Sequence, residues 1–278
     1  MSCLIKNAYL QLSNQYHKKI AVLSDIHYTK GYSLKRLELI YQNLKKNKPD
    51  YICIVGDLLD QGNALEDSVS KYIFFNWLQK LAAIAPLIIS IGNHDMAVRK
   101  QKWQYHYSKE ILEELSQLTN IHVLDNSVFQ DKSICFLGYT LPFDYYYQSP
   151  IEHPELYEDD MEQKIFSRIP KDSYCILLCH TPIYVTHPSI LKAKCLQKIN
   201  LVLSGHMHNG MIPIPIRGNY GIISPCKTFF PKYARGNFKI GKLQYHISGG
   251  TITFSNVSPK LFHLFNPLFP IHIEYITI

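Results

Sequence analysis

Five short apolar segments, each followed directly by residues that can bind a metal, constrain the fold of this chain more than any other feature. Apolar runs of this length, rich in Val, Ile and Leu and bounded by polar or glycine residues, are typical of buried β-strands. The five predicted strands cover residues 19–24, 51–55, 87–91, 174–179 and 201–204. The stretches that follow the first three strands predict helices at residues 33–46, 65–84 and 108–118. Alternating strands and helices favour a mainly parallel sheet covered by helices.

The second half of the chain has a different organisation. We predict a strand at residues 133–137, helices at 155–167 and 191–198, and then short strands and turns rich in Gly and Pro. The last eight residues, 271–278, alternate as a half-buried strand would, with His272 facing outward. An α/β beginning with a strand-rich end predicts an α/β fold of two packed β-sheets flanked by helices. Because neither a repeat nor a linker is visible, we expect one domain over residues 1–278.

Composition sets broad limits on function. Apolar residues make up 46% of the chain, and the net charge of +7 favours anionic partners, whether phosphorylated metabolites, nucleic acid or an anionic membrane. The seven Cys residues lack a CxxC pair, which favours buried free thiols in a reducing compartment over a disulfide framework. We see neither a secretory signal nor a membrane-spanning run, so we expect a cytoplasmic protein.

Asp, Asn or His residues follow the carboxyl end of each of the five predicted strands. Because α/β sheets place their binding crevices at that edge, we expect these side chains to converge. Neutral imidazoles, carboxylates and an amide oxygen suit divalent Mn, Fe or Zn, and the lack of nearby thiolates argues against a structural zinc site. The predicted metal ligands are Asp25, His27, Asp57, Asn93, His180, His206 and His208.

Each of these motifs alone has an ordinary structural explanation. Gly-Asp after a strand is usually a turn, and an isolated His is more often a core or surface residue. Gly-Asn-His-Asp and Gly-His-x-His are rarer, since turn chemistry does not require them. Five such motifs at five strand ends are therefore better explained by a shared metal site than by coincidence.

The motif series D-x-H, G-D-x-x-D, G-N-H-D, H and G-H-x-H resembles that of the calcineurin-like metallophosphoesterase superfamily. Here it occupies residues 25–27, 56–60, 92–95, 180 and 205–208. The resemblance implies a β-sandwich flanked by helices, with two divalent metal ions. It implies one metal held by Asp25, His27, Asp57 and His208. It implies a second metal held by Asp57, Asn93, His180 and His206, so that Asp57 bridges the two.

A weaker resemblance concerns the subfamily. Residues 233–236 (Tyr-Ala-Arg-Gly), the Gly249-Gly250 turn and the closing apolar strand are similar to small bacterial phosphodiesterases of the YkuE/YaeI type. Those proteins often carry His-Thr-His-Gly-Gly-Gln, whereas residues 206–211 here read His-Met-His-Asn-Gly-Met. Both His residues and the second Gly are retained, so the difference bears on the substrate rather than on the metals.

The resemblance also leads us to a mechanism. Two cations would share a hydroxide that attacks phosphorus in line with the leaving oxygen. His94 is not needed as a ligand, and we expect it to protonate or stabilise the leaving group as a catalytic residue. We expect Asp95 to orient the His94 ring and raise its basicity. Asp60 could hold a ligand His from outside the ligand set, or could simply form a turn.

Several functions are compatible with this site chemistry. We favour a phosphodiesterase or pyrophosphatase that acts on a small or lipid-linked phosphate ester. A phosphomonoesterase, a protein phosphatase or a nuclease could use the same site, although the chain lacks a basic stripe with interleaved aromatics for nucleic acid. A non-catalytic metal-binding scaffold would be expected to lack some ligands or His94. The oligomeric state stays open.

Two aromatic or apolar stretches have no motif setting. They are residues 145–147, three consecutive Tyr, and residues 262–270, which include Phe262, Phe265 and Phe269. They could pack beneath long loops, or they could form an apolar rim that meets a lipid-bearing substrate or makes peripheral contact with a membrane.

Overall fold

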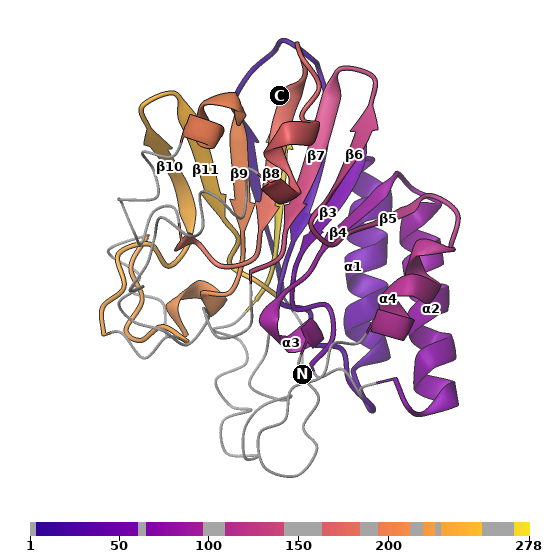
Figure 1. Ribbon diagram of the computed structural model, residues 1–278. Coiled ribbons are helices and arrows are strands. Elements are labelled where there is room, and N and C mark those ends of the chain that lie inside the picture. Colours follow the sequence, from indigo (N-terminus) through magenta and orange to yellow (C-terminus); the bar gives the residue numbers. More distant parts are fainter. Residues whose placement is uncertain are drawn as a thin grey trace.

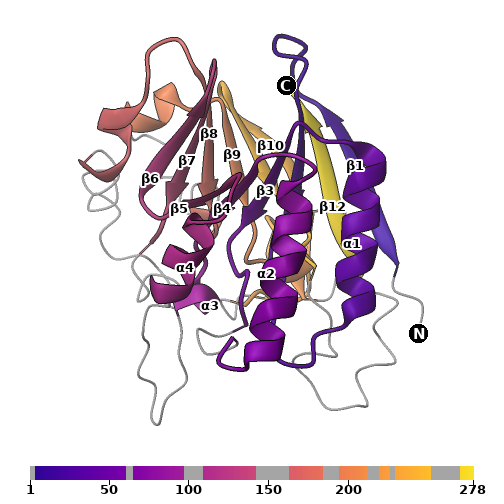
Figure 2. The ribbon, with the colours of Figure 1, turned by 90° about the vertical axis from the view of Figure 1, so that its right-hand side faces the viewer.

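The fold consists of two six-stranded β-sheets that pack face to face, with helices outside them (Figure 1). The computed structural model describes residues 4–60, 65–96, 109–141, 163–183, 194–211, 219–225, 229–251 and 270–278. Helices α1, α2 and α4 cover the outer face of the first sheet (Figure 2). The predicted arrangement of two packed sheets flanked by helices is confirmed.

The first sheet has the strand order β1-β12-β2-β3-β4-β5. Strands β2 to β5 run parallel, whereas β12 is antiparallel to β2 and parallel to β1. The strand bounds are β1 Ile5–Gln11, β2 Lys19–Leu23, β3 Tyr51–Val55, β4 Leu87–Ser90, β5 Ile121–Leu124 and β12 Ile271–Thr277.

The second sheet has the strand order β10-β11-β9-β8-β7-β6. Strands β11, β9, β8 and β7 run parallel, and the two edge strands are antiparallel to their neighbours. The strand bounds are β6 Ser127–Asp131, β7 Ile134–Tyr139, β8 Tyr174–Cys179, β9 Leu201–Ser204, β10 Gly236–Ile240 and β11 Leu243–Ile247.

The helices bury one apolar face each. In α1 (Leu34–Asn47), buried Leu37, Ile40 and Leu44 recur every three or four residues, as an amphipathic helix requires. Helix α2 (Ser68–Ala82) begins later than the predicted residue 65 because the Asp67 side chain caps it and accepts the Ser70 N–H. The described residues also form α3 (Asn93–Met96), α4 (Lys109–Ser116) and the 3-10 helices η2 (Phe166–Arg168), η4 (Lys194–Lys198) and η5 (His208–Gly210).

Both faces of the central strands are buried, which explains their uninterrupted apolar sequences. In β2, Ile20 and Val22 contribute to the core between the two sheets. Ala21 and Leu23, on the opposite face, pack in the core beneath the helices. A third core lies on the outer face of the second sheet and includes Phe166 of η2. Continuous apolar strands are what a sheet covered on both faces needs.

The last strand departs from its prediction. We predicted a half-buried strand with His272 outward, but His272 and Glu274 are buried. The reason is that β12 lies inside the first sheet, between β1 and β2, and contributes side chains to the cores on both faces of that sheet. Its polar side chains therefore need partners within the protein.

Some predicted segments cannot be compared in full with the structure. Residues 145–147, Ser108 and most of the stretches 155–167 and 262–270 lie outside the described residues. The predicted helix at 191–198 is present over Lys194–Lys198 as η4, a 3-10 helix. Among the helices that the structure describes, none is long and apolar enough to cross a membrane.

Candidate metal centre

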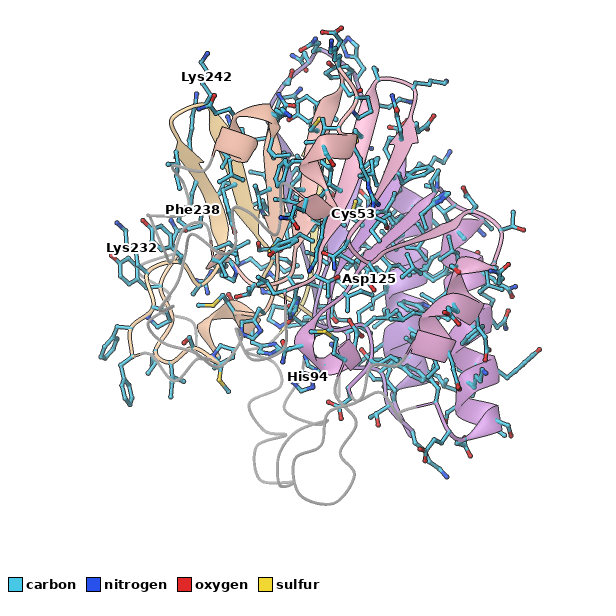
Figure 3. All side chains as sticks on the ribbon, viewed as in Figure 1. Cys53, His94, Asp125, Lys232, Phe238 and Lys242 are labelled. Carbon is cyan, nitrogen blue, oxygen red and sulfur yellow. The ribbon has the colours of Figure 1, made fainter. Side chains whose placement is uncertain are left out.

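The residues predicted to bind metal follow five strands that end at the same end of the sandwich. His94, in the short helix after β4, marks this end (Figure 3). The sheets deliver the side chains there because β2, β3 and β4 are parallel in one sheet, as β8 and β9 are in the other. The residues after these strands are Asp25, His27, Asp57, Asn93, His180, His206 and His208.

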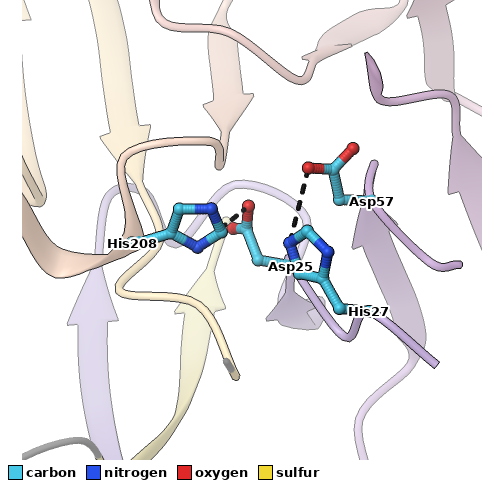
Figure 4. A group of neighbouring side chains, drawn as sticks. All are labelled: Asp25, His27, Asp57 and His208. Carbon is cyan, nitrogen blue, oxygen red and sulfur yellow. Dashed lines mark ion pairs between the residues drawn. The ribbon is translucent and has the colours of Figure 1, made fainter. Parts of the chain in front are cut away.

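One group of four side chains has ligand atoms that all lie within 4.8 Å of one another. It consists of Asp25, His27, Asp57 and His208, whose side chains point toward one another (Figure 4). His27 Nε2 lies 3.5 Å from Asp57 Oδ2, and His208 Nδ1 lies 3.7 Å from Asp25 Oδ1. This group matches the set that the family resemblance implied for the first metal.

A second group, whose ligand atoms also lie within 4.8 Å of one another, contains Asp57, His180 and His206. His180 Nε2 lies 3.1 Å from Asp57 Oδ2, and the rings of His180 and His206 are 5.2 Å apart. Asn93, which completes the implied second set, is buried at the start of α3. Asp57 belongs to both of these groups.

The backbone is strained at these positions. Five of the seven predicted ligands have positive φ, between 45° and 66°, a region that residues with side chains rarely adopt and that clusters at functional sites. Bonds between loops hold this conformation: the Asp25 N–H donates to the Gly56 carbonyl, and the His206 N–H donates to Asp25 Oδ1 at 3.1 Å. The five residues are Asp25, His27, Asp57, His206 and His208.

The glycines of the motifs are required by close approach. A Cβ on Gly56 would overlap the His180 ring, and a Cβ on Gly92 would overlap both the amide and the carboxylate of Asp57. Any side chain at these two positions would displace a predicted ligand. The Gly-Asp and Gly-Asn-His-Asp motifs therefore encode packing of the loops as well as chemistry.

Electrostatics divides the four histidines among the predicted ligands into two kinds. Burial by itself would lower the pKa of His180, but the Asp57 and Asp25 carboxylates and the Val55 carbonyl together outweigh it and raise the pKa to about 9. The pKa of His27 is also raised, because nearby Asp60 and Asp57 outweigh its burial. Burial lowers the pKa of His208 to about 4 and holds that of His206 well below its ordinary value.

The Asp57 carboxylate stays ionised at neutral pH. Burial would raise its pKa, but His180 and its other histidine neighbours hold the pKa well below the ordinary value. Protonated His180 thus balances its charge in the metal-free protein. Binding of cations would displace this proton, because metal ligation needs neutral imidazole.

The residues present fit a pair of divalent cations. Within the described part of the chain, His27 Nε2 and His208 Nδ1 are buried without a hydrogen-bond partner. Buried polar atoms are rarely left in this state unless an ion or water completes them. The donors are nitrogen and oxygen atoms that converge within ligand distance of common centres, which is the chemistry that Mn, Fe or Zn prefers.

The environment of His94 corrects one expectation. We predicted that Asp95 orients the His94 ring, but His94 Nδ1 lies 2.6 Å from the Asp60 backbone carbonyl instead. The Asp95 carboxylate accepts the N–H groups of Leu59 and Gly92, each at 2.8 Å. The reason is helical geometry, since consecutive residues of α3 point in directions about 100° apart. Asp60 also lies near the ligand set, with Oδ1 3.4 Å from His27 Nδ1.

Asp95 therefore fixes two loops and does not orient the His94 ring. Burial, together with the charge of Asp57, raises the pKa of Asp95 to about 7. Its two backbone partners lie in the loops that follow β3 and β4, so this side chain fixes the position of one loop relative to the other.

The carboxyl-terminal part of the chain supplies a support that the motifs did not reveal. The Thr251 hydroxyl donates to the Asp25 carbonyl at 3.1 Å, and its N–H donates to the Ser24 carbonyl. Buried Arg36 in turn donates to the Thr251 carbonyl. Only the adjacent Gly249-Gly250 pair could have suggested this role from the sequence.

Comparison with known proteins agrees with the site. The family model described as calcineurin-like phosphoesterase matches residues 18–210, which include every predicted ligand. This chain belongs to the calcineurin-like phosphoesterase family and is a metal-dependent phosphoesterase. The family uses two divalent metals, and the two Asp/His groups described above are able to bind them.

Two relatives extend the match. The uncharacterized metallophosphoesterase YkuE of Bacillus subtilis is 25% identical over 232 residues, covering 84% of this chain and 71% of YkuE. The uncharacterized metallophosphoesterase Cj0846 of Campylobacter jejuni is 29% identical over 196 residues, covering 70% of this chain but only 45% of that protein. The expected likeness to YkuE is thereby confirmed.

Among solved structures, the phosphopantetheinyl hydrolase of Mycobacterium tuberculosis aligns with a TM-score of 0.49 and 8% sequence identity. The alignment covers 94% of this chain and 96% of the hydrolase.

Proposed function

We propose that this protein is a phosphodiesterase or pyrophosphatase with a two-metal active site. The observation that carries the proposal is that Asp57 belongs to two of the three compact groups of metal-binding side chains in the described part of the chain, the third being His27, Asp60 and His94. One cation would be held by Asp25, His27, Asp57 and His208. The other would be held by Asp57, Asn93, His180 and His206. When bound, such a pair activates a water molecule and balances charge on the phosphoryl group.

Burial of the donors supports this role. The side chains of Asp25, Asp57 and His180 are fully buried, and His27 is 1% exposed. Little bulk water can therefore compete for these donors, and their charges act through a medium less polar than water. Fixed dipoles and charges in such a setting stabilise developing charge without having to reorganise.

We propose that His94 acts as a proton donor rather than as a ligand. Its Nδ1 must donate to the Asp60 carbonyl, since a carbonyl oxygen can only accept. This leaves Nε2 to exchange a proton with substrate. The His94 side chain is 37% exposed, unlike the buried ligands, so a leaving group could reach it. Its ring packs edge-on against His27, with centroids 4.4 Å apart, which keeps it beside the metal centre.

An apolar surface close to the metal centre supports a substrate with a lipid part. Phe229 and Phe230 are 73% and 62% exposed. Their segment pairs with residues 222 and 223, and the Ile223 N–H donates to the Gly210 carbonyl at the end of η5. We therefore retain a lipid-linked phosphate ester and peripheral membrane contact as part of the proposal. If Phe229→Ser changes KM equally for lipid-linked and water-soluble diesters, this part is wrong.

The test of the function is hydrolysis by protein reconstituted with Mn, Fe, Zn or Co. We expect bis(p-nitrophenyl) phosphate to be hydrolysed with a higher kcat/KM than p-nitrophenyl phosphate. A preference for the monoester would indicate a phosphomonoesterase instead. Absence of hydrolysis with every metal and with both esters, nucleotides and lipid-linked pyrophosphates would contradict the proposal and favour a metal-binding scaffold.

A further inference from the structure

Asn209 occupies an unusual position next to the metal centre. It directly follows His208 in η5, has φ of 58° and ψ of 22°, and is 5% exposed. Asn tolerates this left-handed conformation better than most residues, but Gly adopts it with no steric cost. The conformation alone therefore does not explain why a buried amide side chain is used here.

The contacts of the Asn209 side chain fix its orientation. Arg235 Nη1 donates to Asn209 Oδ1 and also approaches the Asn209 carbonyl at 3.4 Å. Because a guanidinium can only donate, the atom facing Arg235 must be the amide oxygen. The amide Nδ2 then faces His272 Nε2 at 3.5 Å, where it donates to the ring nitrogen. Burial lowers the pKa of His272, which agrees with a neutral ring that accepts at Nε2.

The two partners of Asn209 are themselves fixed in the fold. His272 lies within β12, its N–H donates to the Gly250 carbonyl at 3.1 Å, and a Cβ on Gly249 would overlap its ring. Arg235 is half-buried and directly precedes β10. Asn209 thus joins three parts of the fold: Arg235 next to the edge strand β10 of one sheet, the interior strand β12 of the other, and the turn that carries His206 and His208.

We propose that Asn209 is a positioning residue, which with Arg235 and His272 holds the 206–210 turn in the geometry that binds metal. This inference rests on the ligand roles proposed above for His206 and His208. Partners behind the ligands of a metal site typically change metal affinity or activity by about 10–100-fold when they are mutated. The Asn209 amide lies between a guanidinium that can only donate, that of Arg235, and a ring nitrogen that accepts, His272 Nε2. These two bonds together specify a single orientation of the turn.

The first test is Asn209→Gly, which keeps the left-handed backbone and removes only the side chain. We expect Mn²⁺ titration of the metal-free protein by calorimetry to show affinity at one or both sites weakened by about 10–100-fold. We expect the Tm of the metal-free protein to change little, because the turn keeps its backbone preference. Loss of metal affinity without loss of folding is the signature that a purely structural role would not give.

The matched control is Asn120→Gly. Asn120 also has positive φ, 64°, and its amide donates to the Ala82 carbonyl at 2.6 Å. It lies just before β5, at the opposite end of the sheet from the metal centre. We expect this variant to bind Mn²⁺ with wild-type affinity. An equal loss of affinity in both variants would overturn the proposal, since it would show a general effect of removing such an amide.

A second test asks whether Arg235 acts through Asn209. Arg235→Gln removes the donor-only group while leaving a half-exposed position that tolerates a polar side chain. We expect it to weaken Mn²⁺ binding, and we expect the double variant with Asn209→Gly to be no weaker than Asn209→Gly alone. Additive losses would overturn the proposal, because they would show that Arg235 contributes independently of Asn209.

Failure of this inference is distinguishable from failure of the proposed function. If the wild-type protein binds two Mn²⁺ ions and hydrolyses diesters, but Asn209→Gly binds Mn²⁺ equally tightly, only the positioning role is wrong. If the wild-type protein binds no Mn²⁺ at all, the two-metal function fails first, and the positioning role fails with it.

Discussion

Replacing Asp57 by Asn tests the bridging arrangement most severely among single substitutions. The change keeps the shape of the side chain and removes one negative charge from a fully buried position. In the wild-type protein the backbone N–H of His94 donates to Asp57 Oδ1 at 2.8 Å, and the amide oxygen of Asn can still accept this bond. The protein is therefore expected to fold, and the effect should fall on the metals.

The magnitude follows from the distances at Asp57. A positive centre as close to Oδ2 as His180 Nε2, at 3.1 Å, gains about 5 kcal/mol from a full charge at an effective dielectric constant of about 20. The net loss in the variant is smaller than this, because burying a carboxylate costs the wild-type protein desolvation free energy that a neutral amide does not require. We expect metal affinity to fall by roughly 10²–10³-fold, since each tenfold change in affinity corresponds to about 1.4 kcal/mol.

The assay is metal content by plasma mass spectrometry after desalting, followed by diester hydrolysis. We expect Asp57→Asn to retain fewer than two metal equivalents and to lose most of its kcat/KM. Asp50→Asn is the control, since Asp50 pairs with Lys18 at the surface, with Oδ1 2.7 Å from Lys18 Nζ. Two retained equivalents with full activity in Asp57→Asn would refute the bridging role.

Three further substitutions probe separate parts of the account. His94→Ala should keep both metals but lower kcat by about 10²–10⁴-fold for poor leaving groups, with a smaller loss for aryl esters; equal losses for both would argue against proton donation. Gly92→Ala should force a methyl group into Asp57 and reduce unfolding free energy by about 1–3 kcal/mol along with metal content, measured by urea titration. Burial would raise the pKa of Glu274, but hydrogen bonding and charge from His246 hold the pKa below its ordinary value of 4.5. Ionised Glu274 therefore stabilises the folded state above about pH 4.5, and this contribution is lost as the pH falls below that value. The stability difference between wild type and Glu274→Gln should thus shrink as pH falls through this range, and a constant difference would contradict it.

Much of the fold could be predicted because its strands are buried on both faces. The predicted strands at residues 51–55, 174–179 and 201–204 have the bounds that the structure shows. Strands β1, β5 and β6 were not predicted, because at the sheet edges the burial pattern is mixed and the apolar signal weak. The prediction of one domain over residues 1–278 stays a prediction.

The site was predictable wherever the chemistry lies in a contiguous motif, and not elsewhere. Asp25-x-His27 and His206-x-His208 could be identified because the ligand types follow apolar strands. The Asp95 role was misjudged because adjacency in sequence does not mean contact within a helix. Thr251 and His272 could not be assigned, since each acts on residues far away in sequence, and only pairing of the sheets brings them together.

The most direct test of the central claim is the anomalous scattering of a crystal of the wild-type protein loaded with Mn²⁺. The account predicts two anomalous peaks about 3.5–4 Å apart, the separation typical of two-metal sites, with the Asp57 carboxylate between them. A single peak, or two peaks of which only one lies within bonding distance of Asp57, would contradict it.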